Sequence, residues 1–283
     1  MRQLNSISDP VYTERPLNRL EQFFLPFIRD KRDLPFVFLC LQIACTIIPA
    51  AVALYFTDGI VWWVLAAVFL ALEAYFMGPF ILMLHNTSHN VFFKNEYKLG
   101  NRLIPWGLCP FMGQSPDTYF SHHIGMHHSE NNLELDKSST MQYQRDSFAD
   151  FLKYFFRFLF VGIFDLLQYL RFKKKDKFFK KAIIGEATFF IVAVVLLWFD
   201  WQTTVLVFVA PLVIVRFLMM AGNWAQHAFI DPATPENNYR NSITCINSDY
   251  NRKCWNDGYH IGHHLKPHLH WTEMPKDFLA NST

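Results

Sequence analysis

WNDGYHIGHH, residues 255–264, places three histidines within five positions, at His260, His263 and His264. On a helix, residues four apart share a face, so His260 and His264 point the same way and His263 lies beside them. Neutral imidazole is a good ligand for iron, zinc and copper. Because polar rings gathered this closely are costly to pack unless they bind something, the stretch predicts a metal site that the rest of the chain serves.

Three other stretches repeat this pattern: HNTSH at 85–89, HHIGMHH at 122–128 and NWAQH at 223–227. No histidine precedes residue 85, and only His122, His268 and His270 fall outside the repeated spacings. An isolated histidine is usually a surface or satisfied core residue. So many in i,i+3 and i,i+4 spacing favour metal ligands instead. The nine candidates are His85, His89, His123, His127, His128, His227, His260, His263 and His264.

The composition indicates an integral membrane protein, because 52% of the residues are hydrophobic, 17% are aromatic and only 18% are charged. Four apolar runs are long enough to cross a bilayer as helices; the first would reach about 31 Å. The sequence therefore predicts an all-α fold of four transmembrane helices, in a membrane domain over residues 36–283 preceded by an amphipathic N-terminal lead over 1–35. The spans are expected at about 36–56, 60–84, 182–199 and 203–221.

Two further segments lie beside the membrane without crossing it. Residues 103–112 are apolar but short and broken by proline, which favours an interfacial or re-entrant segment. Residues 150–171 are aromatic and amphipathic and lead into a basic cluster, which favours a helix in the membrane plane. Glu73 lies inside the second span. It is expected to be either a functional carboxylate or the partner of a polar group on another span. Arg216, in the fourth span, is expected either to snorkel to the membrane surface or to pair inside the bundle.

Four spans place both termini on one side of the membrane. The opposite loops, residues 57–59 and 200–202, contain Asp but no Lys or Arg, so the positive-inside rule assigns the side of the termini to the cytoplasm. Every histidine cluster follows the second or fourth span or lies in the segments on that same side. The sequence thus predicts a cytosolic, histidine-rich helical cap, at the endoplasmic reticulum or the bacterial inner membrane.

Nine histidines exceed one tetrahedral zinc site and suit two first-row metals with open positions, and iron with nitrogen ligands and dioxygen is the chemistry that such a site would need. A zinc protease would show HExxH, but Asn86 stands where the glutamate should be. Four carboxylates near the clusters are candidates for orienting histidine N–H groups, although each is more simply explained as a solvated loop acid: Asp117, Glu130, Asp136 and Asp257.

With these motifs the chain, from about residue 36 to about residue 271, resembles the membrane-bound fatty acid desaturases, a superfamily that includes membrane hydroxylases and carotenoid-oxygenating enzymes. The HxxxH of its first histidine box matches His85 and His89, and the second box matches His123, His127 and His128. The third box matches residues 260–264. In acyl-CoA desaturases an NxxxH element adds a histidine and an asparagine that reaches a metal through water, which Asn223 and His227 match.

The resemblance implies a non-haem di-iron centre, O2 as co-substrate and a desaturase that introduces a double bond into a fatty acyl chain of a lipid. A membrane hydroxylase or ketolase on the same centre stays open, as does, from another class, a non-enzymatic membrane metal or haem carrier. Acyl-CoA, acyl-lipid and other lipid substrates all stay open. The reasons are the short first box, the three residues between His123 and His127, and the neighbouring His122. With no HPGG cytochrome b5 motif, the electron donor is expected to be a separate cytochrome b5-like or ferredoxin-like protein; no nucleic-acid partner is expected.

Overall fold

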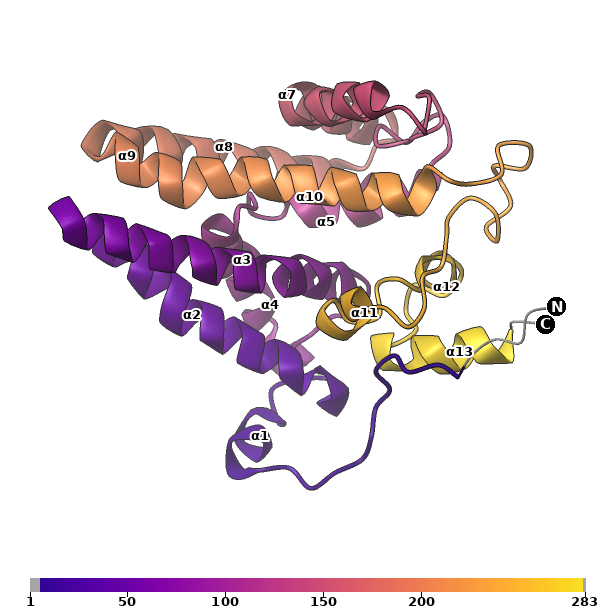
Figure 1. Cartoon of the computed structure of the whole chain (residues 1–283), viewed down its shortest axis with the longest axis horizontal. Helices are drawn as coiled ribbons and strands as arrows, with labels where there is room; N and C mark the ends of the chain where they lie inside the picture. The colour runs from indigo at the N-terminus through magenta and orange to yellow at the C-terminus, as the bar shows by residue number, and fades with distance from the viewer. Residues whose placement is uncertain (1–5, 282–283) are drawn as a thin grey trace.

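The computed structural model describes residues 6–281, and within them every regular element is a helix or a helical turn (Figure 1). An isolated antiparallel bridge joins Ile28 to Phe93. The described elements confirm the all-α fold. Four stretches of helix are long and apolar enough to cross a membrane, in agreement with the four predicted spans.

The first two spans are α2 (Leu34–Leu54) and α3 (Gly59–His89), which pack against each other. The third is α8 (Asp176–Phe199). The fourth is one continuous helical run made of α9 (Trp201–Thr204), the π-turn η6 (Val205–Val209) and α10 (Ala210–His227). Compared with the predicted ranges, α8 begins earlier and α3 and α10 end later, because polar residues continue each helix beyond its apolar run.

The helix α3 and the fourth helical run are both longer than the core of a bilayer is thick. With 31 residues, α3 is about 46 Å long, whereas the bilayer core is about 30 Å thick. The box that follows the second span therefore lies on an extension of the same helix, as predicted. The fourth run, residues 201–227, likewise continues beyond its apolar part and ends at His227. Both connections between paired spans lie at one end of the molecule, and the two termini lie at the other (Figure 1).

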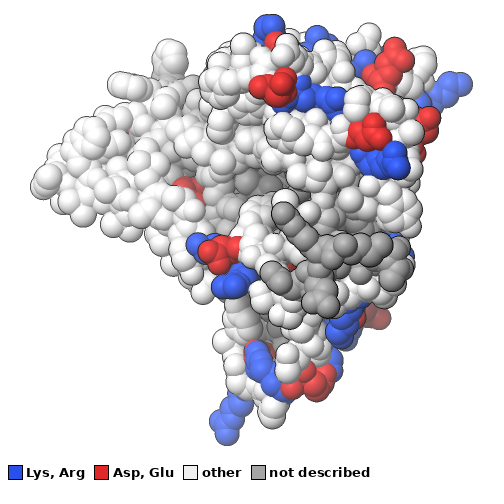
Figure 2. Space-filling model, turned by 45° about the vertical axis from the view of Figure 1, so that its right-hand side comes forward, with Lys and Arg blue, Asp and Glu red and all other residues white. Residues whose placement is uncertain are grey.

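Charge is distributed along the molecule as this arrangement requires. The tapered end formed by the span tips, on the left of Figure 2, is white, whereas Lys, Arg, Asp and Glu gather over the end that carries the termini. Large apolar side chains are exposed along the spans, among them Trp63, Val194 and Trp198. Apolar surface of this extent is what a lipid-facing protein exposes.

Between α3 and α8 the chain builds most of the cap from short elements: η2 (Asn95–Tyr97), α4 (Gly100–Leu103), η3 (Ile104–Leu108), η4 (Cys109–Met112), α5 (Thr118–His122), η5 (His123–His127) and α6 (His128–Glu130). Two glycines let the middle of this segment lie directly on the spans. A Cβ at Gly185 of α8 would lie 1.7 Å from the Pro116 carbonyl oxygen, and Gly113, with φ +68°, sits against the Pro211 carbonyl. These contacts fix the segment from which α5 begins.

The aromatic segment forms α7 (Phe148–Phe172), which is not among the helices able to span a membrane. It packs on α8 and α10, and Figure 1 shows it strongly foreshortened beside α8, so its axis runs across the spans. The side away from the core exposes Phe156, Phe160 and Phe164. An aromatic face next to the basic end of the helix fits the predicted in-plane orientation, which stays a prediction.

Both ends of the chain close the cap. The N-terminal lead contains α1 (Arg19–Phe24) and η1 (Lys31–Asp33), and the C-terminal part contains α11 (Asp249–Lys253), α12 (His260–Leu265), η7 (Trp271–Glu273) and α13 (Met274–Ala280). A buried pair between His270 and Asp33, with 2.9 Å between Nε2 and Oδ1, joins the two ends.

Polar groups inside the spans differ in their pairing. Arg216 donates to Glu186 at 2.8 Å, which confirms the pairing alternative for this arginine. Glu186 also accepts from Ser115 at 2.8 Å, so the pair helps to hold the segment between Gly113 and α5. Glu73 is 3% exposed, and neither of its carboxyl oxygens has a hydrogen-bond partner among the described residues. No polar group on another span therefore pairs with Glu73 in the described part of the chain.

Candidate metal centre

The fold brings all nine candidate histidines together, and it divides them into two groups. The five-histidine group consists of His85, His89, His123, His128 and His263. The four-histidine group consists of His127, His227, His260 and His264. Within each group one ring nitrogen from every residue lies within 4.8 Å of all the others. Two adjacent sets of converging nitrogens are the arrangement expected for two metal ions.

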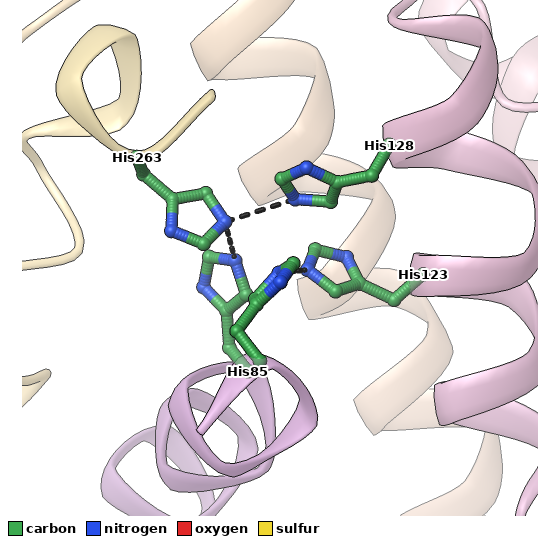
Figure 3. A group of neighbouring side chains, drawn as sticks. His85, His123, His128 and His263 are labelled. Carbon is green, nitrogen blue, oxygen red and sulfur yellow. Dashed lines mark hydrogen bonds between the residues drawn. The ribbon is translucent and has the colours of Figure 1, made fainter. Parts of the chain in front are cut away.

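In the five-histidine group the Nε2 atoms meet at the centre. His263 Nε2 lies 2.7 Å from that of His85 and 2.9 Å from that of His128. The Nε2 atoms of His89 and His123 are 3.0 Å apart. Figure 3 shows the labelled rings pointing toward one another from separate elements: α3, the η5–α6 segment and α12. Neutral imidazoles offer few hydrogens to share among so many facing nitrogens, so the donor set fits a metal cation at the centre.

The four-histidine group has the same construction. His260 Nε2 lies 3.1 Å from His227 Nε2 and 3.0 Å from His264 Nε2. The ring of His127 lies 5.2 Å from that of His227 and 5.3 Å from that of His264, centroid to centroid. Because α12 contributes to both groups, its six residues connect the two candidate metal positions.

The second histidine box is a π-turn. In η5 the His128 N–H donates to the His123 carbonyl, five residues earlier, instead of the usual four. The extra residue in the turn places His128 above His123, so both rings enter the five-histidine group, while His127 turns to the four-histidine group. The unusual spacing of this box is therefore absorbed by the backbone, and His123, not His122, joins a cluster.

Behind the facing nitrogens, other groups accept hydrogen bonds from the opposite side of the rings. His85 Nδ1 lies 2.5 Å from Asp257 Oδ1, and His127 Nδ1 lies 2.7 Å from Asp136 Oδ2. His227 Nδ1 lies 2.7 Å from the Asn241 carbonyl oxygen. A proton on Nδ1 leaves the Nε2 lone pair free, which is the tautomer that binds a metal through Nε2.

Asp136 and Asp257 are themselves held in place. Asp257 accepts from Gln226 at 2.8 Å and from Tyr250 at 2.6 Å, and Asp136 accepts from the Ser138 hydroxyl at 2.6 Å. The other two candidate acids do not face the histidines. Asp117 binds Trp106 and Lys181, and Glu130 binds Tyr169 and Lys173. The sequence had favoured solvated loop acids at all four positions, which is wrong for the two buried aspartates.

Burial favours the neutral form of several imidazoles at the centre. It lowers the pKa values of His123, His260 and His263 well below the ordinary value, and neighbouring imidazoles lower them further. The pKa values of His128 and His264 fall for the same reasons. Neutral imidazole is the form that donates a lone pair to a metal, so the rings are prepared as ligands at neutral pH.

A cavity of about 590 Å³ opens beside these histidines. Its walls come from α3, α5, η5, α10, α11 and the segment before α11, and Figure 2 shows the molecule hollowed between its two halves. Apolar side chains such as Ile81, Leu82 and Leu218 line it, and both histidine groups border it through His85, His123, His127 and His260. The structure therefore has an apolar cavity directly beside the two potential metal positions.

The remaining histidines and Asn223 lie at the edge of the centre. His268 Nδ1 faces the His89 carbonyl at 3.0 Å and is exposed, and His270 is bonded to Thr272 and Asp33. His122 packs against Phe158, its Nε2 is buried without a hydrogen-bond partner, and burial lowers its pKa to about 4. Asn223 lines the cavity, and its amide nitrogen donates to the Ser138 carbonyl and the Tyr154 hydroxyl.

Sequence reasoning missed several groups that hold this centre: Asp9, Asn241, Tyr250, Gln226 and Asn256. Each acts through one or two hydrogen bonds to groups far away in the sequence or in loops, and no spacing pattern in the sequence predicts such contacts.

The fatty acid desaturase family model matches residues 60–280, which is most of the chain and includes all the histidine boxes. No curated protein and no solved structure matches the chain. The family match, the four apolar helices and the two histidine groups agree with one another. The chain is an integral membrane oxidoreductase with a desaturase- or hydroxylase-type function on a lipid, and it belongs to the fatty acid desaturase family.

Proposed function

We propose that the chain is an oxygen-dependent desaturase that introduces a double bond into a fatty acyl chain of a lipid at a non-haem di-iron centre. The single observation that supports this best is the pair of converging histidine groups on the wall of an apolar cavity. An apolar cavity beside two potential metals favours oxidation of a hydrocarbon chain over hydrolysis, which would need a water path and a polar substrate group.

Iron fits the donor set for two reasons. Zinc has no redox chemistry and prefers four ligands, whereas the five-histidine group exceeds that number. Imidazole suits iron, and two bound irons would supply the oxygen-dependent, two-electron chemistry needed to remove hydrogens from neighbouring unactivated methylenes. The proposed ligands are the nine histidines, with Asn223 acting through water.

The residues of the chain have separate tasks in this proposal. Ile81, Leu82 and Leu218 bind the acyl chain and exclude water from the reacting segment. Asp136 and Asp257 keep the protons of His127 and His85 on Nδ1, so that both Nε2 atoms face the centre. Asn223 is held at the cavity wall by Tyr154 and Ser138, where its free amide oxygen can accept from a water.

A hydroxylase or ketolase is the second candidate, because the three-residue spacing between His123 and His127 also occurs in relatives of that kind. Both reactions use the same centre and differ in whether oxygen is transferred before the second hydrogen leaves. A non-enzymatic metal or haem carrier has less support, because haem needs only two axial histidines and the family is one of oxidoreductases. The electron donor is proposed to be a separate cytochrome b5-like or ferredoxin-like protein.

Lipid mass spectrometry after expression in a host of known lipid composition tests the proposal. A desaturase yields acyl chains lighter by two mass units, and a hydroxylase yields chains heavier by sixteen. The His260→Ala variant is the matched control and is expected to yield neither. Metal analysis should find about two irons per chain. Stoichiometric zinc with full activity, in protein from iron-replete cells, would contradict the di-iron centre.

A further inference from the structure

The N-terminal lead reaches the third histidine box across almost the whole chain. We call residues 6–10 the N-terminal strap. The Asp9 carboxylate accepts from the Tyr259 hydroxyl at 2.7 Å, over a separation of 250 residues. The Pro10 carbonyl accepts from Asn256 at 2.7 Å. The strap therefore holds the segment immediately before His260 at two points.

These contacts are buried although the strap has no regular structure. Asp9 is 5% exposed, Asn256 and Tyr259 are each 2% exposed, and the Tyr259 ring packs on Phe278. Asp9 also accepts from the Asn247 backbone N–H at 2.7 Å, and the Ser8 N–H donates to the Asn247 side chain at 2.7 Å. Buried hydrogen bonds to a carboxylate are stronger than neutral ones, so the strap is firmly attached.

The segment that the strap holds adopts an unfavourable backbone conformation. Trp255 and Asn256 have φ values of +54° and +57°, in the left-handed region that side-chain-bearing residues rarely enter. Such a turn persists only when its surroundings fix it. Trp255 Nε1 donates to the Pro79 carbonyl of α3 at 2.8 Å, and Asn256 donates to both Pro10 and Trp271.

The turn leads directly into residues of the proposed metal centre. Asp257, directly after Asn256, accepts a hydrogen bond from His85 Nδ1, and His260, directly after Tyr259, is the first residue of α12. A helix of six residues is not stable in isolation, and no side chain caps the start of α12. The position of α12 therefore depends on tertiary contacts such as the one between Asp9 and Tyr259.

We propose that the N-terminal strap is a positioning element of the metal centre, with Asp9 acting through Tyr259 on His260 and Pro10 acting through Asn256 on Asp257. The first contact serves the four-histidine group and the second serves the five-histidine group. This inference rests on the proposed metal centre. It gives the N-terminal lead a role in metal binding that no histidine pattern reveals.

Cobalt binding to the full-length protein in detergent tests the strap without relying on turnover. Tyr259→Phe removes one oxygen atom, keeps the ring against Phe278 and is therefore expected to fold. Because α12 contributes to both groups, Tyr259→Phe and Asp9→Ala should each weaken cobalt binding roughly 10–100-fold and shift the visible spectrum of the bound cobalt. The double variant should be no worse than the more severe single variant, because both changes remove the same bond.

Glu14→Gln is the matched control, since Glu14 lies in the same lead but is exposed and pairs with the exposed Lys31. It should leave both ions and the spectrum unchanged. Wild-type cobalt affinity and an unchanged spectrum in Tyr259→Phe would overturn the positioning role. If the wild-type chain binds neither cobalt nor iron, the proposed metal centre itself is wrong, so the two failures are distinguishable.

Discussion

Each histidine at the centre faces its group through one nitrogen, and the three with hydrogen-bonded Nδ1 atoms are further oriented from behind. Ala at any of the nine removes a donor that no neighbouring side chain replaces. We therefore expect each of the nine Ala variants to lose turnover and at least one metal ion. Metal content and lipid products of the purified variants measure this.

His268→Ala is the control, because this ring is exposed, packs beside His89 and belongs to neither histidine group. It should retain substantial activity, as should His122→Ala and His270→Ala, while Asn223→Ala should be intermediate because a second water can partly replace it. If three or more of the nine Ala variants remain active, the di-iron interpretation fails. If His123→Ala is active and His122→Ala is inactive, then His122 rather than His123 is the ligand and the di-iron interpretation stands.

The lowered pKa values of buried imidazoles predict that the metal-free protein loses stability in acid. Burial lowers the folded-state pKa of His122 to about 4 and those of His260 and His263 well below normal, whereas unfolded histidine titrates at about 6.5. The unfolded chain binds more protons, so the free energy of unfolding is highest above about pH 6.5 and falls as pH decreases toward the folded-state values. Thermal melts of metal-free protein between pH 8 and pH 5 measure this, and an unchanged Tm would contradict it.

At the scale of the element, η5 shows how a helix accommodates an additional residue without losing its ligands. Deleting Ile124 should convert the π-turn into an ordinary turn, since residues four apart on an α-helix also share a face. We expect the deletion variant to keep two metal ions, because His123 and His128 would still lie on the same face of the helix. Metal analysis of the purified variant checks this.

Insertion of one alanine after Ile124 is the matched control. It adds a second extra residue, which the turn cannot absorb while Gly125 stays packed against Leu170 and Phe178. The insertion variant should lose metal from both groups. Equal metal content in the two variants would show that the register of this turn does not position the histidines.

At the scale of the whole molecule, the spans and the cap predict one membrane topology. Asp58 and Gln202 lie near the connections at the apolar end, and Glu134 lies exposed in the cap. With Cys45 and Cys245 replaced by Ser, single cysteines at 58 and 202 should be labelled from the far side of the membrane, and one at 134 from the cytoplasm. Labelling of 58 and 134 from the same side would refute the four-span arrangement.

The amino-acid sequence by itself determined the properties that local chemistry controls. The long apolar runs predicted four membrane helices, because a single segment in lipid satisfies its own backbone hydrogen bonds only as a helix. The type and spacing of the histidines identified nine candidate ligands, and all nine meet in the structure. The in-plane placement of α7 and the cytoplasmic orientation remain predictions that rest on aromatic and basic residues.

Only the tertiary structure decided how those ligands are divided and held. Whether His127 joins His123 or His260 depends on a π-turn and on the position of α12, and neither α5 nor α12 is long enough to be stable alone. The Asp9–Tyr259 contact joins residues 250 positions apart, and the contact between His85 and Asp257 joins residues 172 positions apart. Such contacts form only after the whole chain has folded, because their energy comes from burial that no local segment can achieve.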